Sequence, residues 1–264
     1  VYKRQLLYLS NNTRIDITYA VSQVARFTHN PKQSHGEALK MIVRYLAKTQ
    51  DKGLIVKPSK KLTLHAHVDA DFSGLHGREP QDDPNSARSR YGYIICFNGI
   101  PLVWKSQLIK EICQSTLHSE YVGLSYCCRA LIPMRELILD VLSFHGLIDG
   151  SLSSTDPTDN PKSRKTDSSD SVAPTDDIKF QISCKIFEDN QGAFLLATNQ
   201  KLTPRSRYFS SKYHFFWSYT KTKENPDGWL EIQKCETKLQ DADYLTKGLT
   251  RFLFEENRKR VQGW

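Results

Sequence analysis

Four acidic residues in this sequence could bind divalent metal ions: Asp69, Glu120, Asp189 and Asp243. Magnesium prefers hard oxygen ligands and is usually held by a few carboxylates together with phosphate oxygens of a substrate. Two such ions, about 3.5 to 4 Å apart, can activate a water on one side of a phosphodiester and stabilise the leaving alkoxide on the other. Each acid alone also has a structural explanation, because strand ends, helix faces, helix caps and first helical turns commonly carry acids.

Asp69 ends a predicted strand that reads LTLHAHVD. Leu64, Ala66 and Val68 alternate with polar residues, so one face of the strand can pack on a core while Asp69 faces a polar cleft. Residues 70–74 then break the alternation. A rigid strand that ends in a carboxylate beside an open loop is a common position for metal chemistry.

The segments around this strand predict a small antiparallel sheet. Residues 53–62 indicate a hairpin around the turn PSKK, and residues 75–90 have the composition of a loop. Two apolar runs then meet at Asn98 and Gly99, which is a strong signal for a two-residue hairpin turn. We expect three antiparallel strands, of which the strand described above is the first.

Glu120 lies on a predicted amphipathic helix, in which apolar residues recur at spacings of three and four after a Ser–Thr pair that can cap it. We expect this helix to end at Pro133 and a second helix to cover residues 134–144. Residues 149–177 consist mostly of Ser, Thr, Asp, Pro and Lys, which is typical of a disordered insertion.

The other two acids follow the insertion. A predicted strand ends in Glu188–Asp189. Residues 228–235 are expected to form another strand, and residues 240–260 one final helix with Asp243 near its start. At the other end of the chain, apolar spacing predicts two helices within residues 6–52.

The composition is that of an ordinary soluble globular protein, with 39% hydrophobic and 25% charged residues. The 37 Lys and Arg exceed the 29 Asp and Glu, and the net charge of +8 weakly favours a polyanionic partner such as nucleic acid. Six cysteines without metal-binding spacing predict buried free thiols in a reducing compartment. No apolar run reaches the roughly 18 residues of a membrane helix, and no secretory leader is visible. We therefore expect no membrane partner and no secretion.

The motifs VDADFSG, STLHSEYVGLS, FEDNQGAF and QDADYLTKGL, in this order, resemble the ribonuclease H domain of copia-type retrotransposon polymerase polyproteins. The strings RSRYGY, PLVWKSQ and SKYHFF fit the same pattern. The resemblance runs from about Leu6 to about Leu253, with residues 149–177 outside it. Each motif alone is weak, whereas the ordered set is specific.

This resemblance implies an α/β, ribonuclease H-like fold: a mixed five-stranded sheet, three antiparallel strands and then two parallel ones, flanked by helices. It divides the chain into a helical connection segment over 1–52, a first part of the nuclease domain over 53–148, the insertion over 149–177 and a second part over 178–264. Residues 1–5, VYKRQ, look like a translated sequencing-library adapter, so we expect the natural chain to continue upstream. The implied partner there is the reverse transcriptase domain of the same polyprotein.

The resemblance also implies a two-metal site. Asp69 and Asp189 would bridge two magnesium ions, for which manganese can substitute. Glu120 would bind one ion near the scissile phosphate, and Asp243 would complete the other site.

Three more acidic or amide residues receive supporting roles by the same resemblance. Asp71 is a candidate on the phosphate side, Asn190 caps the helix after the second metal-binding strand, and Asp241 caps the last helix. Cellular relatives carry a His in the loop before that helix, whereas this chain has ETKLQ at 236–240. Slower or partner-dependent cleavage is therefore implied.

A basic and aromatic stretch from Lys201 to Lys223 could bind nucleic acid, because bases can stack on rings while phosphates meet cations. A helix with a buried aromatic side and a solvated basic side explains the pattern equally well. The family's usual His and Asp in this stretch are replaced by Tyr208 and Ser210, which puts details of binding in doubt. The candidate nucleic-acid-binding residues are Lys201, Arg205, Arg207, Lys212, Tyr213 and His214.

These features predict a metal-dependent endonuclease that cuts the RNA strand of RNA/DNA hybrids during reverse transcription, in the cytoplasm, within virus-like particles, or in the nucleus. The alternative is a catalytically degenerate remnant that binds nucleic acid or serves as a structural module. An integrase or transposase fits less well, because those enzymes place their Glu after two Asp residues, whereas Glu120 comes second here.

Overall fold

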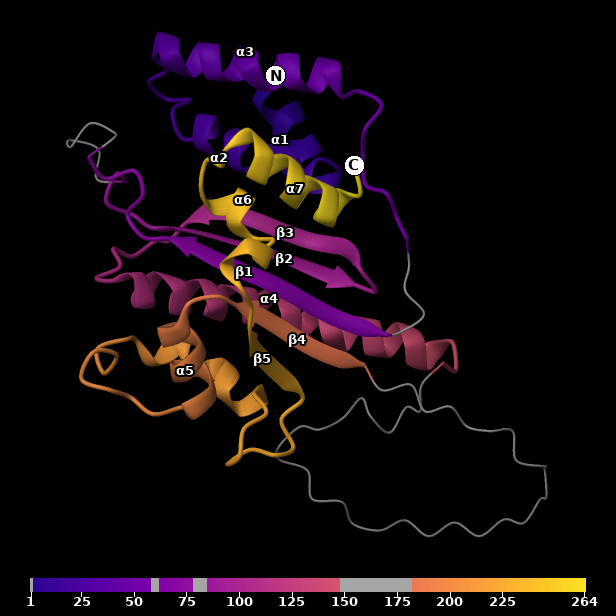
Figure 1. Cartoon of the computed structure of the whole chain (residues 1–264), viewed down its shortest axis with the longest axis vertical. Coiled ribbons are helices and arrows are strands. Elements are labelled where there is room, and N and C mark those ends of the chain that lie inside the picture. Colours follow the sequence, from indigo (N-terminus) through magenta and orange to yellow (C-terminus); the bar gives the residue numbers. More distant parts are fainter. Residues whose placement is uncertain (1, 58–61, 78–84, 148–181) are drawn as a thin grey trace.

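A mixed five-stranded sheet is the centre of the computed structural model, which describes residues 2–57, 62–77, 85–147 and 182–264 (Figure 1). The strand order is β3-β2-β1-β4-β5. The first three strands are antiparallel, whereas β4 and β5 run parallel to β1. The predicted α/β sheet is thus confirmed. The strands are β1 (Thr63–Asp71), β2 (Arg90–Phe97), β3 (Ile100–Leu108), β4 (Ser183–Glu188) and β5 (Leu230–Lys234).

Local patterns account for the central strands. Leu64, Ala66 and Val68 are fully buried on one face of β1, as their alternation predicts. Asn98 and Gly99 have φ values of 52° and 80°, the left-handed conformation that a tight hairpin turn between β2 and β3 requires. The predicted hairpin is therefore confirmed.

Helices cover both faces of the sheet (Figure 1). The long helix α4 packs on the face that carries Val68, and α5 contributes to the same core. On the other face, α6 and α7 share a second core with β2 and β3, and the three N-terminal helices lie on that side (Figure 1). The helices are α1 (Tyr2–Asn12), α2 (Thr18–Ala25), α3 (Gln33–Lys48), α4 (Thr116–Phe144), α5 (Gln191–Asn199), α6 (Asp243–Thr246) and α7 (Arg251–Gln262).

Pro133 does not end a helix, so the prediction of two helices over 117–144 is wrong. α4 continues through Pro133 as one helix of 29 residues. A proline in a helix loses one backbone hydrogen bond and strains the preceding turn. Here Leu131 on one side of Pro133 and Leu139 on the other are both buried in the same core, and this packing holds the helix together.

The predicted final helix over 240–260 is also wrong in extent, because it is split into α6 and α7. Lys247 is extended, with φ −137° and ψ 158°, and ends α6 after four residues. Asp241 does not cap α6, since the N-cap is Ala242; its carboxylate instead accepts a hydrogen bond from Arg260 Nε at 2.7 Å.

The segment before β1 differs from prediction as well. Residues 53–57 form no strand, so the expected hairpin there is wrong, and its turn at 58–61 lies outside the described residues. The Ile55 N–H instead donates to Gln262 O at 3.0 Å. The N-terminal segment contains a third helix, α1, which was not predicted. The predicted insertion over 149–177 lies outside the described residues.

The basic and aromatic stretch forms short turns of 3-10 helix rather than one long helix. They span Ser211–Tyr213 and Phe215–Tyr219, and similar turns occur at Ile15–Ile17 and Thr237–Leu239. Within the described parts of the chain, every helix is too short or too polar to cross a lipid bilayer.

Candidate metal centre

Asp69 lies near the end of the central strand, where it faces α6. Asp69 is only 3% exposed to solvent. The Thr246 hydroxyl donates a hydrogen bond to Asp69 Oδ2, and Lys247 Nζ lies 3.8 Å from the same oxygen. The strand pattern predicted a carboxylate opposite the apolar face of β1; the tertiary structure supplies the partners that surround it.

Glu120 comes from the first turns of α4, and Asp189 directly follows β4. Ser115 caps α4 by accepting a hydrogen bond from His118 N at 3.1 Å, which fixes the start of the helix beside β1. Ligand oxygens of Asp69, Glu120 and Asp189 all lie within 4.8 Å of one another. Three of the four predicted metal-binding acids therefore meet at one point.

Asp243 lies next to this trio but is engaged differently. Its Oδ1 lies 2.9 Å from Lys247 Nζ, four residues further along the chain. The same ammonium lies 3.8 Å from Asp69 Oδ2, so Lys247 is a neighbour of both the fourth acid and the central carboxylate. Lys247 was not among the predicted site residues, although its place after the Asp of the QDADYLTK motif could have drawn attention to it.

Burial dominates the electrostatics of these acids. It raises the pKa of Asp69 from its ordinary value of 3.8 to about 7, with Lys247 opposing the rise and Asp243 adding to it. Burial also raises the pKa of Glu120 well above its usual range, and the neighbouring Glu188 carboxyl adds to that shift. Burial and the nearby acids thus disfavour negative charge at the site unless positive charge is added.

Glu188 is a fifth acid at the centre, and no role was predicted for it. It is fully buried, and burial raises the pKa of its carboxyl well above the usual range. Its Oε1 accepts a hydrogen bond from Asn190 N at 3.1 Å. The signal in the sequence was the alternation of β4, which places Glu188 on the same buried face as Cys184 and Ile186.

The donor set fits a hard divalent cation. Three carboxylates converge on one point, and the buried Glu120 Oε2 has no hydrogen-bond partner among the described residues. A buried oxygen without a donor is costly, and a metal ion would satisfy it. A polar cleft of about 450 Å³ opens over the site and is lined by Asp69, Ala70, Asp71, Phe72, Thr116, Glu120, Asp189, Asn190, Thr237 and Lys247.

The two supporting residues Asn190 and Asp71 lie at the metal cleft. Asn190 caps α5, because its side-chain oxygen accepts hydrogen bonds from Gly192 N at 2.9 Å and Ala193 N at 3.0 Å. Asp71 lines the cleft, and its carboxylate packs so closely on Gly74 that a Cβ there would lie 1.7 Å from Oδ2.

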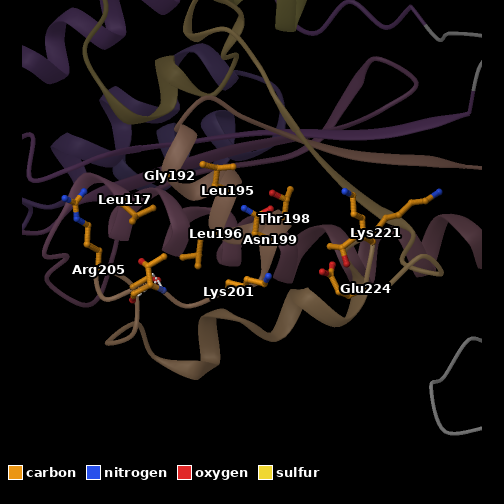
Figure 2. A pocket seen from close by; sticks show the side chains of 14 residues that line it. Leu117, Gly192, Leu195, Leu196, Thr198, Asn199, Lys201, Arg205, Lys221 and Glu224 are labelled. Atoms are coloured by element: carbon orange, nitrogen blue, oxygen red, sulfur yellow. Dashed lines mark hydrogen bonds between the residues drawn. The ribbon is translucent and has the colours of Figure 1, made fainter.

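A second, larger hollow adjoins the metal centre. This basic groove has a volume of about 790 Å³. Leu117 and Gly192 line it, while Thr116 and the nearby Asn190 line the metal cleft, so the two hollows are neighbours. Figure 2 shows Arg205 and Lys221 at opposite sides of the groove with Lys201 between them.

The other candidate nucleic-acid-binding residues are divided between surface and interior. Arg207 and Lys212 are exposed, and Lys212 forms an ion pair with Glu111. Tyr213 is only 1% exposed. The His214 ring forms a hydrogen bond with Tyr121 OH at 2.8 Å, so the last two side chains belong to the packing of this segment against α4.

Comparisons with known proteins connect this fold to retrotransposons. The chain is 27% identical over 249 residues to the retrovirus-related Pol polyprotein from transposon RE2 of Arabidopsis thaliana, a match that covers 94% of this chain and 14% of that polyprotein. It is also 27% identical over 250 residues to the corresponding polyprotein from transposon TNT 1-94 of Nicotiana tabacum, covering 95% of this chain and 15% of that one.

A shorter match leads to a protein with a different description. The chain is 33% identical over 120 residues to the secreted RxLR effector protein 161 of Plasmopara viticola, which covers 79% of that protein but 46% of this chain. No protein-family model and no solved structure matches the chain. The matches to the Pol polyproteins, in contrast, extend over nearly the whole chain.

Proposed function

We propose that this retroelement-derived chain is a metal-dependent endonuclease. The chain is related to copia-type Pol polyproteins and spans about 14% of their length. Its substrate is the RNA strand of an RNA/DNA hybrid. The observation that carries the proposal is the meeting of Asp69, Glu120 and Asp189 within 4.8 Å. They come together on a sheet of the ribonuclease H-like kind.

The four acids have separate tasks in this proposal. Asp69, Glu120 and Asp189 would hold one magnesium ion, and Asp243 would complete a second site that shares Asp69 and Asp189 with the first; manganese can replace either ion. When bound, the ions supply positive charge that activates a water and neutralises the scissile phosphate. The protein contributes rigidity, because three of the acids are fixed on β1, α4 and the end of β4, a placement that limits their motion.

The basic groove holds the backbone of the nucleic acid beside the metal centre. Lys201, Arg205, Lys221 and Lys223 line it together with one acid, Glu224. Cations in a concave surface bind phosphates without reading sequence. Sequence-independent binding suits an enzyme that must degrade RNA of any sequence during reverse transcription, with the upstream reverse transcriptase domain presenting the hybrid.

The proposal is tested with a labelled RNA/DNA hybrid and purified protein. The Asp189→Asn variant is expected to lose magnesium-dependent cleavage by at least about a hundredfold, because one metal ligand is lost while the shape is kept. Asp51→Asn, a change at an exposed acid that lines neither the metal cleft nor the basic groove, is the matched control and should cleave like the wild type.

Manganese should support cleavage, and EDTA should abolish it. Equal cleavage by the wild type and Asp189→Asn would refute the assignment of the site. Binding of the hybrid without cleavage by the wild type would favour the alternative, a degenerate nucleic-acid-binding remnant.

A further inference from the structure

Lys247 places a positive charge beside two of the proposed metal ligands. Its Nζ lies 2.9 Å from Asp243 Oδ1 and 3.8 Å from Asp69 Oδ2. Asp243 is absent from the group of carboxylates that converge among the described residues, which consists of Asp69, Glu120 and Asp189. The centre therefore has two unlike halves, a carboxylate trio and an Asp–Lys–Asp arrangement, with Asp69 common to both.

The backbone around α6 fixes this arrangement. α6 is four residues long, and the extended conformation of Lys247 ends it. Leu245, in the same short helix, is fully buried. A Cβ on Gly92 of β2 would lie 2.7 Å from the Leu245 Cβ, which shows how closely α6 is seated on the sheet. The packing of α6 thus fixes the backbone position from which the Lys247 side chain extends.

The Lys247 side chain can still move away from Asp69 and Asp243. It is 39% exposed, and a lysine is a compact charge on a flexible stem of four carbons. A magnesium ion bound to Asp243 Oδ1 at about 2.0 to 2.1 Å would compete for that oxygen with the ammonium, which lies 2.9 Å from it. The two positive charges would also repel each other at this short distance.

We propose that Lys247 is a resident cation that holds the Asp69–Asp243 position until a second divalent ion displaces it. This inference rests on the proposed function. Its consequence is an unequal pair of metal sites: the carboxylate trio binds one ion directly, whereas the second ion must first expel the ammonium. Lys247 thereby keeps the second site weak and makes full loading depend on the metal concentration or on the added charge of a bound phosphate.

Manganese binding to the purified chain, measured by calorimetry and by the electron paramagnetic resonance signal of free Mn²⁺, tests the proposal without recourse to activity. The wild type should bind one ion tightly and a second one weakly. Lys247→Met should tighten the second site by about tenfold or more, because a unit charge a few Å away is removed. Lys247→Arg keeps the charge and should leave the second site weak.

Lys52→Met is the matched control, because the Lys52 side chain is 43% exposed and pairs with Asp51 rather than with an acid of the centre; its two affinities should equal those of the wild type. Identical isotherms for the wild type and Lys247→Met would overturn the proposal. Absence of any Mn²⁺ binding by the wild type would instead refute the proposed function, and loss of the tight site in Asp189→Asn would support that function independently of Lys247.

A measurement on the unaltered protein covers the case in which Lys247→Met does not fold. Magnesium is titrated into protein with ¹⁵N-labelled lysine, and the ammonium signal of Lys247 is followed by NMR. The signal should be restrained without magnesium and become mobile at the concentrations that fill the second site. A signal that stays restrained when two ions are bound would overturn the proposal.

Discussion

At the scale of single residues, the centre is a group of acids that the protein buries at a cost. Asp69 and Glu120 are 3% and 5% exposed, and Glu188 behind them is fully buried. Carboxylates in such surroundings take up protons or bind cations, because an unpaired buried charge is strongly disfavoured. Without metal, protons and the ammonium of Lys247 compensate the charge; with metal, the proposed ions do so.

This competition predicts how stability depends on pH. The folded-state pKa of Asp69 is about 7, above its ordinary value of 3.8, so the folded state binds the proton more tightly than the unfolded state does. The stabilisation is fully present below about pH 4 and is lost as the pH rises through 7. In EDTA, we expect this group to lower the free energy of unfolding between those values, as measured by urea denaturation.

Magnesium should reduce this fall, because bound ions replace the protons. Asp69→Asn removes the titrating group and should flatten the same part of the profile. A wild-type stability that rises between pH 4 and 7 in EDTA, with no change of slope in Asp69→Asn, would contradict the prediction.

At the scale of elements, the short helix α6 determines the second half of the centre. It carries Asp243 and Thr246 and leads into Lys247, and Thr246 binds Asp69 across the boundary between helix and strand. Gly92 of β2 permits this approach, because a Cβ there would lie 2.7 Å from Leu245 Cβ and 3.0 Å from Thr246 Cγ2. The position of α6 against the sheet therefore depends on the glycine in β2 as well as on the residues of α6.

Gly92→Ala should move α6 away from the sheet. We expect a loss of about 1 to 3 kcal/mol in the free energy of unfolding, as for other overpacked positions, and weaker binding of the second Mn²⁺ ion. Gly36→Ala is the control, because a Cβ at Gly36 in α3 meets nothing within 4 Å; it should be neutral or slightly stabilising. Unchanged stability and metal binding in Gly92→Ala would contradict the prediction and show that α6 can accommodate the added Cβ.

At the scale of the whole molecule, a buried polar network ties the N-terminal helices to the C-terminal one. Arg14 Nη2 lies 2.8 Å from Asp16 Oδ2, and Tyr45 OH in α3 donates to the same oxygen at 2.6 Å. Arg258 Nη1 in α7 donates to Tyr45 OH at 3.2 Å. The segment expected to end at residue 52 is thus joined to the last helix of the chain.

Asp16→Ala should therefore destabilise both ends of the chain. Removing one partner of a buried ion pair leaves an uncompensated charge and typically costs about 3 to 5 kcal/mol, measurable by urea denaturation. Hydrogen exchange should show faster exchange in α1–α3 and α7 together. Asp51→Ala, which breaks an exposed pair with Lys52, should leave the stability nearly unchanged, because solvent screens such pairs.

The exchange pattern also tests the predicted division of the chain near residue 52. Loss of protection confined to α1–α3, with α7 unchanged, would support an N-terminal unit that is independent of the rest. Loss of protection in α1–α3 and α7 together would mean that the division near residue 52 separates sequence motifs but not independently folded units.

The sequence by itself determined the features that follow from local periodicity and turn chemistry. The alternation around Val68 placed Asp69 on the face opposite the core, Asn98 and Gly99 specified a hairpin, and the motif order predicted a mixed sheet that is confirmed. Backbone geometry imposes these patterns within a few residues, so they can be read without the fold.

Only the tertiary structure decided which charges meet. Thr246 and Asp69 are 177 positions apart in the chain and share a hydrogen bond, and α4 runs through Pro133 because the core holds it on both sides. The meeting of three acids, the burial of Glu188 and the place of Lys247 depend on how β1, β4, α4 and α6 pack. The spacing of residues along the sequence does not determine these distances, because they depend on packing between segments that are far apart in the chain.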